Sequence, residues 1–221
     1  MMRVLVIRPE PGASATVMRA RERGIDAISM PLFAVEPIAW TAPDSDLFDG
    51  LLVTSANAMR HGGESLGNLK ALPVFAVGKT TAGAASDAGF GVTAIGNSGV
   101  DDLLERLDPN LRLLHLCGED RREPKEAAQE ITRLAVYRSR PIEMPDLSSA
   151  RNVIALVHSP RAAQRFAELV EERRSIIVAA ISRAAASAAG AGWESVHIAA
   201  QPTDDALLAL VARLCNKPDP G

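Results

Sequence analysis

The stretch LLVTSANAM, Leu51 to Met59, returns near the other end of the chain as ALVHSPRAA, Ala155 to Ala163. In both copies an apolar run of strand length ends at a serine, and the residues after the serine have the composition of a helix. The two serines, Ser55 and Ser159, lie 104 residues apart. Repetition at this distance predicts that one domain-sized unit occurs twice.

A second block repeats at nearly the same offset. AVGKTTAGAASDAGFGVTAI, Ala76 to Ile95, runs parallel to AISRAAASAAGAGWESVHIA, Ala180 to Ala199, and the Asp-Asp pair at 101–102 is matched by another at 204–205. Because three blocks keep the same order at an offset of 103 to 104 residues, duplication is favoured over chance similarity in Ala-rich sequence.

One match breaks the tandem order. The opening RVLVIRPEP resembles RLLHLCGED, Arg112 to Asp120, but the first precedes the Ser55 block and the second follows it. The start of the chain must therefore complete a domain formed by the C-terminal third, and both chain crossings are β-prone. We predict a discontinuous domain one, a continuous domain two and two linker strands, at residues 1–34 plus 142–221, 40–134, and 35–39 with 135–141.

Short apolar runs rich in Val, Ile and Leu alternate with helical patterns along the whole chain. This alternation is typical of βα units, and it predicts an α/β fold with mainly parallel, buried sheets. The expected strands are residues 3–7, 26–32, 50–54, 73–77, 92–95, 112–117, 153–158, 176–181 and 195–199.

Composition limits the number of domains, the cellular compartment and the class of ligand. The chain has 221 residues, of which 47% are hydrophobic and 23% charged, as in a globular protein of one large or two ordinary domains. Two cysteines, Cys117 and Cys215, form neither a disulfide framework nor a metal-ligand spacing, which predicts a reducing, cytoplasmic compartment. The N-terminal apolar core VLVI is too short for a signal peptide or a membrane span. A net charge of −3 with 4% aromatic residues disfavours a nucleic-acid surface.

Familiar chemical motifs are absent or incomplete. Gly78-Lys79-Thr80 has Pro73 where a phosphate loop requires glycine, and GFGVTA at 89–94 precedes a strand instead of following one, so neither nucleotide motif is satisfied. The chain has no GxSxG nucleophile elbow. The four histidines, at 61, 115, 158 and 197, lack ligand spacing, so they are predicted to be structural and no metal site is expected.

Small polar and basic residues gather at the predicted strand-to-helix turns. In parallel α/β sheets, ligands bind at the carboxyl ends of the strands, where helix N-termini favour anions. Two such domains facing each other would line a cleft with anion-binding groups. Each residue also has an ordinary interpretation, because Ser and Thr cap helices and surface arginines are solvated. The residues in this pattern are Arg8, Ser55, Lys79, Thr80, Thr81, Gly118, Arg121, Arg122, Ser159, Arg161, Ser182, Arg183, Pro202 and Thr203.

With these motifs in order, the sequence resembles the uroporphyrinogen-III synthase family over nearly the whole chain. The family's order is matched by an opening strand ending in RP, then TSANA, AVGKTTA, CGEDRRE, the linker VYRSRP, HSPRAA, and QPT before the last helix. Two departures occur: the second GxxTA becomes SRAAA at 182–186, and Pro124 stands where a longer aliphatic residue is usual. The resemblance implies two similar three-layer α/β/α domains with mainly parallel sheets (flavodoxin-like), joined by a two-stranded β linker.

The resemblance also implies a reaction. It is the cyclisation of hydroxymethylbilane, a linear tetrapyrrole with eight carboxylates, to uroporphyrinogen III with inversion of ring D, by a cyclising hydro-lyase that uses no cofactor and no metal. Without the enzyme, the bilane closes directly to the type I isomer. The protein must bend the substrate, hold its carboxylates and assist the departure of water, which are tasks of positioning and general acid catalysis.

The single tyrosine, Tyr137, lies in the predicted linker and matches the linker tyrosine of the family. The resemblance makes it the candidate general acid, while a half-buried strand aromatic is the alternative interpretation. We expect a monomer whose partner is the small-molecule substrate, with no nucleic acid and no membrane. The candidate substrate-binding residues are Arg8, Ser55, Gly78, Lys79, Thr81, Gly118, Ser159, Arg161 and Thr203.

Two other functions fit the same pattern. A cytoplasmic two-domain module could bind or sense a small anion without catalysis, and a degenerate relative could have only a structural role. The isomer composition of the product formed from fresh hydroxymethylbilane distinguishes these from an enzyme.

Overall fold

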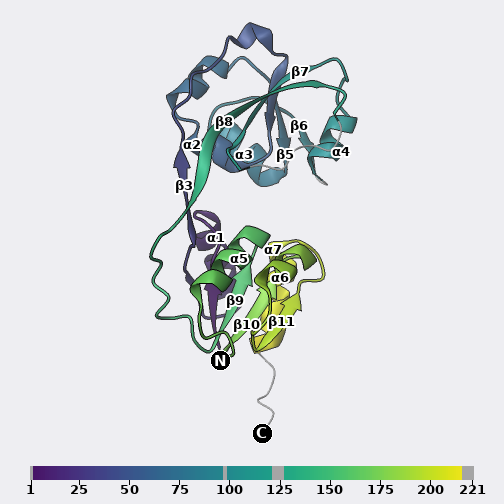
Figure 1. Ribbon diagram of the computed structural model, residues 1–221. Coiled ribbons are helices and arrows are strands. Elements are labelled where there is room, and N and C mark those ends of the chain that lie inside the picture. The colour runs from purple at the N-terminus through teal and green to yellow at the C-terminus, as the bar shows by residue number, and fades with distance from the viewer. Residues whose placement is uncertain (1, 97–98, 121–126, 216–221) are drawn as a thin grey trace. The chain divides into compact units, whose positions relative to one another are not determined.

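The computed structural model describes residues 2–96, 99–120 and 127–215, and the chain forms two compact units. Unit 1 comprises residues 1–34 and 141–221, and unit 2 comprises residues 35–140. Each unit contains one sheet flanked by helices (Figure 1). The predicted α/β class with two mainly parallel sheets is confirmed.

The sheet of unit 1 has the order β11-β10-β9-β1-β2, and all its neighbouring strands are parallel. Arg3 of β1 is opposite Val153 of β9, so the beginning of the chain completes a sheet made by a much later segment. Its elements are β1 (Arg3–Val6), α1 (Gly12–Glu22), β2 (Ala27–Ser29), β9 (Val153–Val157), α5 (Pro160–Leu169), β10 (Ile176–Ala180), α6 (Arg183–Ala189), β11 (Ser195–Ile198) and α7 (Asp204–Cys215).

Helices cover both faces of this sheet, and this explains why β9 (VIALV) and β10 (IIVAA) are apolar at every position. On one face, α1 and α7 pack on the even-numbered residues of β1. Helix α1 buries residues 13, 16, 17 and 20, the spacing of one helical stripe. On the other face lie α5 and α6.

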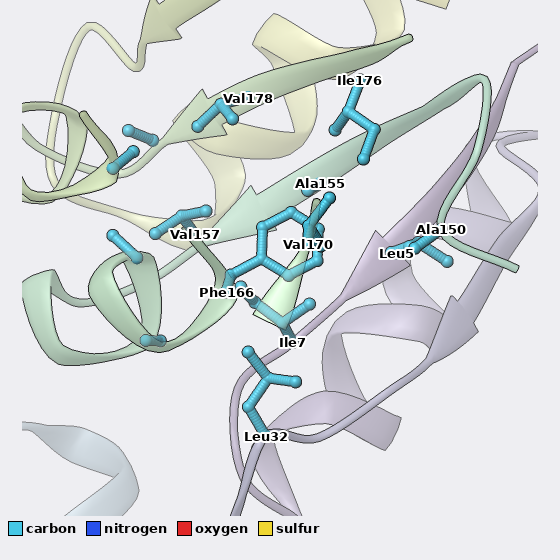
Figure 2. Packing of buried hydrophobic residues seen from close by; sticks show 14 of the residues in the cluster. Leu5, Ile7, Leu32, Ala150, Ala155, Val157, Phe166, Val170, Ile176 and Val178 are labelled. Atoms are coloured by element: carbon cyan, nitrogen blue, oxygen red, sulfur yellow. The ribbon is translucent and has the colours of Figure 1, made fainter. Parts of the chain in front are cut away.

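Phe166 of α5 is the largest fully buried side chain of unit 1, with 1% of its surface exposed. Figure 2 shows its ring between β9 and β1, beside Val157, Val170 and Ile7. The ring also stacks on Trp193, with centroids 5.4 Å apart and an interplanar angle of 2°. Phe166 therefore lies at the centre of the core on this face of the sheet.

The sheet of unit 2 has the order β3-β8-β7-β4-β5-β6. Helices α2 and α3 cover one face, and α4 covers the other. Of the residues expected as linker strands, 35–37 fall in β3 and 135–141 in β8, and both strands are also members of this sheet, whereas residues 38–39 lie beyond β3. Strand β8 begins at Glu130 because its first half pairs with β7. The elements are β3 (Phe33–Pro37), η1 (Ser45–Leu47), β4 (Gly50–Val53), α2 (Ala56–His61), η2 (Glu64–Leu69), β5 (Val74–Val77), α3 (Lys79–Asp87), β6 (Val92–Gly96), α4 (Val100–Glu105), β7 (Arg112–Gly118) and β8 (Glu130–Pro141).

Within the described residues, no helix has both the length and the apolar character needed to cross a bilayer. Both cysteines are free, Cys117 buried in β7 and Cys215 partly exposed at the end of α7.

Candidate functional site

Tyr137 lies on β8 next to the carboxyl end of β7, and a β-bulge sets its position. Cys117 pairs with Ala135, but Gly118 pairs with Tyr137, so Val136 is an extra residue on the β8 side. Successive residues of a regular strand point to opposite faces. Because of the bulge, Val136 and Tyr137 both contact the same core cluster.

The Tyr137 ring packs against the backbone of Gly118. A Cβ atom added to Gly118 would lie 2.8 Å from ring atoms Cε2 and Cζ and 3.0 Å from the hydroxyl oxygen. The phenol is hydrogen bonded to Ser55, and the ring centroid of His61 lies 6.4 Å away. Gly118, Ser55 and Tyr137 are therefore brought together in unit 2.

Burial raises the pKa of Tyr137 above the usual value of a phenol, and the hydrogen bond with Ser55 opposes this effect only in part. Burial also lowers the pKa of His61, with a further contribution from the charge of Arg60. At neutral pH the phenol therefore keeps its proton, as a general acid requires.

Replacement of Gly118 by alanine tests whether this contact positions the ring. The new methyl group collides with Tyr137, and overpacking of this kind typically costs about 1–3 kcal/mol. We expect a lower thermal midpoint and a weaker contact between the phenol and Ser55. Gly67→Ala is the matched control, because an added Cβ there meets no atom within 4 Å. Equal midpoints for the two variants would show that Tyr137 does not depend on Gly118.

The other candidate residues of unit 2 lie around the start of α3. Gly78 precedes this helix with φ of 82°, a left-handed conformation that favours glycine. Lys79 is exposed in the first turn, whereas Thr81 is buried, with 5% exposure. Since β7, β4 and β5 are adjacent and parallel, Gly118, Ser55 and Gly78 share one edge of the sheet.

The hydroxyl groups predicted at the helix starts make capping hydrogen bonds. Ser55 accepts from the amide of Asn57 at 3.2 Å, Ser159 from that of Ala162 at 3.1 Å, and Thr203 from that of Ala206 at 3.3 Å. Ser182 caps α6 in the same way, so loss of the Gly and Thr of the family pattern leaves this helix start intact. Arg161 is exposed, with its guanidinium carbon 4.5 Å from the centre of the Phe33 ring. Arg121 and Arg122 lie outside the described residues.

In unit 1 the strand ends hold a polar cluster centred on Asp204, the first residue of α7. His158 Nε2 lies 2.7 Å from its Oδ1, and Thr16 Oγ1 lies 3.1 Å from its Oδ2. Arg19 forms an ion pair with the same carboxylate, and Arg8 Nη1 lies 3.7 Å from Oδ1. We refer to these five residues as the Asp204 cluster.

Of this cluster, the sequence interpretation named only Arg8 as a site residue and took His158 as structural. A signal was present in the repeats: His158 occupies the position of Thr54, and Asp204 begins the repeated Asp-Asp pair. Thr54 also has a polar partner at its strand end, since its hydroxyl lies 3.0 Å from His115 Nε2.

Burial and the neighbouring charges shift the pKa values of His158 and Asp204. Burial lowers the pKa of His158, and although Asp204 opposes this, the nearby charge of Arg8 adds to it. Burial acts to raise the pKa of Asp204, but the hydrogen bond and charge of His158, with Arg19 and Thr16, lower it below the usual value. At neutral pH the carboxylate is therefore charged and the imidazole is neutral.

The stability of unit 1 should fall in acid. A group whose pKa is lower in the folded state contributes stability above its unfolded pKa and loses it as the pH falls. For His158 this loss begins near 6.5, its unperturbed value, and Asp204 adds a further loss at lower pH. We expect the thermal midpoint to drop less between pH 7 and pH 5 in His158→Gln than in the wild type. His197→Gln, on edge strand β11, is the control, and identical drops in all three proteins would contradict this account.

No group of three or more His, Cys, Asp or Glu residues that could hold a metal ion occurs in the part of the chain that the structure describes. The candidate groups are hydroxyls, amides, guanidiniums, the ammonium group of Lys79 and one phenol, which suit an anionic organic ligand.

Comparison with solved structures shows that the chain has the α/β fold of solved uroporphyrinogen-III synthases. The crystal structure of uroporphyrinogen-III synthetase from Helicobacter pylori 26695 is 19% identical, with 97% of this chain and 100% of that chain covered and a TM-score of 0.69. A mutant uroporphyrinogen III synthase from the extremely thermophilic bacterium Thermus thermophilus is 17% identical, with 98% and 100% covered and a TM-score of 0.52. At these identities the likeness concerns the fold.

Comparison of the sequence with protein families identifies the family. The model of the family Uroporphyrinogen-III synthase HemD matches residues 14–209. The chain therefore belongs to the uroporphyrinogen-III synthase HemD family, and the resemblance found in the sequence is confirmed. A comparison with curated proteins gave no match.

Proposed function

We propose that this protein catalyses the cyclisation of hydroxymethylbilane to uroporphyrinogen III with inversion of ring D. The observation that carries the proposal is the protonated Tyr137 phenol, half-buried between Ser55 and Gly118 at a strand end where anion-binding turns begin. Membership of the HemD family supports the choice of a tetrapyrrole substrate. The two free cysteines support a cytoplasmic location, and we propose that the protein acts as a monomer.

In the proposed first step, the terminal hydroxyl group of the bilane leaves as water. The leaving oxygen takes the Tyr137 proton while the pyrrole nitrogen supplies the electron pair that forms the azafulvene. Ser55, hydrogen bonded to the phenol, orients this proton. The resulting phenolate regains a proton when the final ring loses one. The overall reaction is dehydration and ring closure without net redox change, so the proposal includes no cofactor.

In the following steps, the substituted carbon of ring D attacks the electrophilic azafulvene carbon to form a spiro intermediate, which fragments and recloses with the ring inverted. The protein contributes by holding the flexible chain in the bent form that permits this attack. We propose that the substrate carboxylates bind to backbone amides at the starts of α3, α5 and α7, with Gly78 and Thr81, Ser159, and Thr203 at these turns. Lys79, Arg8 and Arg161 add positive charge.

The test is to supply fresh hydroxymethylbilane and determine the isomers of the cyclised product by chromatography after oxidation. A product dominated by type III supports the proposal. A product consisting of type I alone, at the spontaneous rate, contradicts it and favours the anion-binding or sensor function. A control without protein gives the spontaneous rate.

A further inference from the structure

The Asp204 cluster joins four elements that are far apart in the sequence. Arg8 follows β1, Arg19 lies on α1, His158 follows β9, and Asp204 begins α7. All of them converge on one carboxylate, together with Thr16 of α1. A single, largely covered carboxylate therefore contacts residues that follow two adjacent strands and binds the guanidinium groups of two arginines.

The cluster carries more positive than negative charge. Two guanidinium groups share one carboxylate, and His158 is neutral at neutral pH, so the cluster itself has an excess of one positive charge. Among the described residues, the neighbouring acids Asp205 and Glu10 form no ion pair with Arg8 or Arg19: Asp205 pairs with Arg23 at 2.7 Å, and Glu10 accepts from Ser14 and Ser29.

The guanidinium groups that carry the excess charge are partly exposed, whereas the carboxylate that binds them is largely covered. The side chains of Arg8 and Arg19 are 34% and 39% exposed, whereas those of Asp204 and His158 are 11% and 7% exposed. Solvent, or an anion from solvent, can therefore reach the guanidinium groups but has little access to the carboxylate. Burial lowers the pKa of Arg8; the charge of Asp204 opposes this effect, and the charge of Arg19 adds to it. A second anion would relieve the remaining repulsion between the two arginines.

Gly12 has no side chain, and the side chain of Arg8 occupies the space that one would fill. This side chain lies against the first turn of α1, where a Cβ atom on Gly12 would come within 2.6 Å of Arg8 Nε. A side chain at this position would push the guanidinium away from Asp204. The arrangement thus depends on a residue without a Cβ atom as well as on the ion pairs.

We propose that Arg8 and Arg19 together form a subsite for one carboxylate of the substrate, and that Asp204, supported by His158 and Thr16, is the positioning residue that fixes both guanidinium groups. The inference rests on the proposed function and deepens it, because it adds Arg19 as a binding residue and assigns Asp204 and His158 a role. Paired guanidinium groups suit a carboxylate because they can donate parallel, charge-assisted hydrogen bonds.

The experiment compares Arg8→Met, Arg19→Met and Arg19→Lys in the full-length protein, with hydroxymethylbilane as substrate and the type III product as readout. We expect KM to rise about tenfold in the Met variants while kcat changes less than about twofold, because one charge-assisted contact with bound substrate is lost. Arg19→Lys keeps the charge and should recover part of the loss. Arg3→Met is the matched control, because Arg3 lies at the opposite end of β1 and pairs with Asp26.

Two further variants test positioning. Asp204→Asn removes the shared charge without touching substrate, and it should raise KM as much as the arginine variants; Gly12→Ala should do so with an intact Asp204. A purely structural cluster would lower the thermal midpoint in Asp204→Asn but leave KM unchanged. The inference is overturned if KM stays within twofold of wild type in both arginine variants while the wild type makes type III product.

Failure of the proposed function can be separated from failure of the subsite. If the wild type forms no type III product, binding is measured instead by calorimetry with benzenehexacarboxylate as the probe. Loss of affinity in Arg8→Met and Arg19→Met, but not in Arg3→Met, retains the carboxylate subsite in a non-catalytic protein. Equal affinities in all four proteins, or no binding by the wild type, reject it.

Discussion

Replacement of Tyr137 by phenylalanine should slow the formation of uroporphyrinogen III by on the order of a hundredfold, the usual contribution of a general acid. The change removes one hydroxyl group and its hydrogen bond to Ser55, but it keeps the ring and its packing on Gly118. Spontaneous closure to the type I isomer continues at its own rate. The measurement is the ratio of type III to type I product at a fixed enzyme concentration, with the thermal midpoint recorded alongside.

Ser55→Ala provides the companion variant. It leaves the phenol in place but removes its hydrogen-bond partner and the cap of α2, so we expect a smaller loss of rate and a modest loss of stability. Full type III activity in the Phe variant would show that Tyr137 is a packing residue only, and that catalysis depends on the binding geometry alone.

Truncation of Phe166 to alanine should destabilise unit 1 by about 3–5 kcal/mol, the range found when large aromatic residues are removed from a core. The ring is 1% exposed, and its stacking partner Trp193 would lose its contact (Figure 2). Denaturant unfolding measures the free energy of unfolding, and hydrogen exchange locates the loss. We expect protection to fall first in β9 and β10.

Phe75→Ala is the counterpart in unit 2, where Phe75 is 6% exposed in a separate core cluster. Its loss of protection should appear in β4 and β5 instead. A cost below about 1 kcal/mol for Phe166→Ala would mean that α5 and α6 close over the cavity and that the ring is not the main support of this face.

The sequence was a good guide to the fold because buried parallel strands have a simple signature. Runs such as VIALV and IIVAA are apolar at every position, end at a small polar residue and are followed by a helix, so their number and order could be predicted. The displaced RVLVIRPEP block indicated that the chain returns to its starting sheet, and β1 pairs with β9.

The candidate site was less accessible to sequence reasoning. The hydroxyls of Ser55, Ser159 and Thr203 could be placed at helix starts because capping is a local interaction. The bulge at Val136 has no local signal, since it arises from the pairing of β7 with β8. The contact between His158 and Asp204 joins residues from different elements, and only the folded sheet brings them within 2.7 Å.

The pairing of β1 with β9 also constrains how the protein is made. About 150 residues separate the two strands, so at a synthesis rate of about 5–20 residues per second the ribosome releases β1 roughly 8 to 30 s before its partner. Unit 2 is contiguous and can fold in this interval. During this interval the apolar segment VLVI cannot pair with β9. It therefore remains exposed to aggregation until the last third of the chain has been translated.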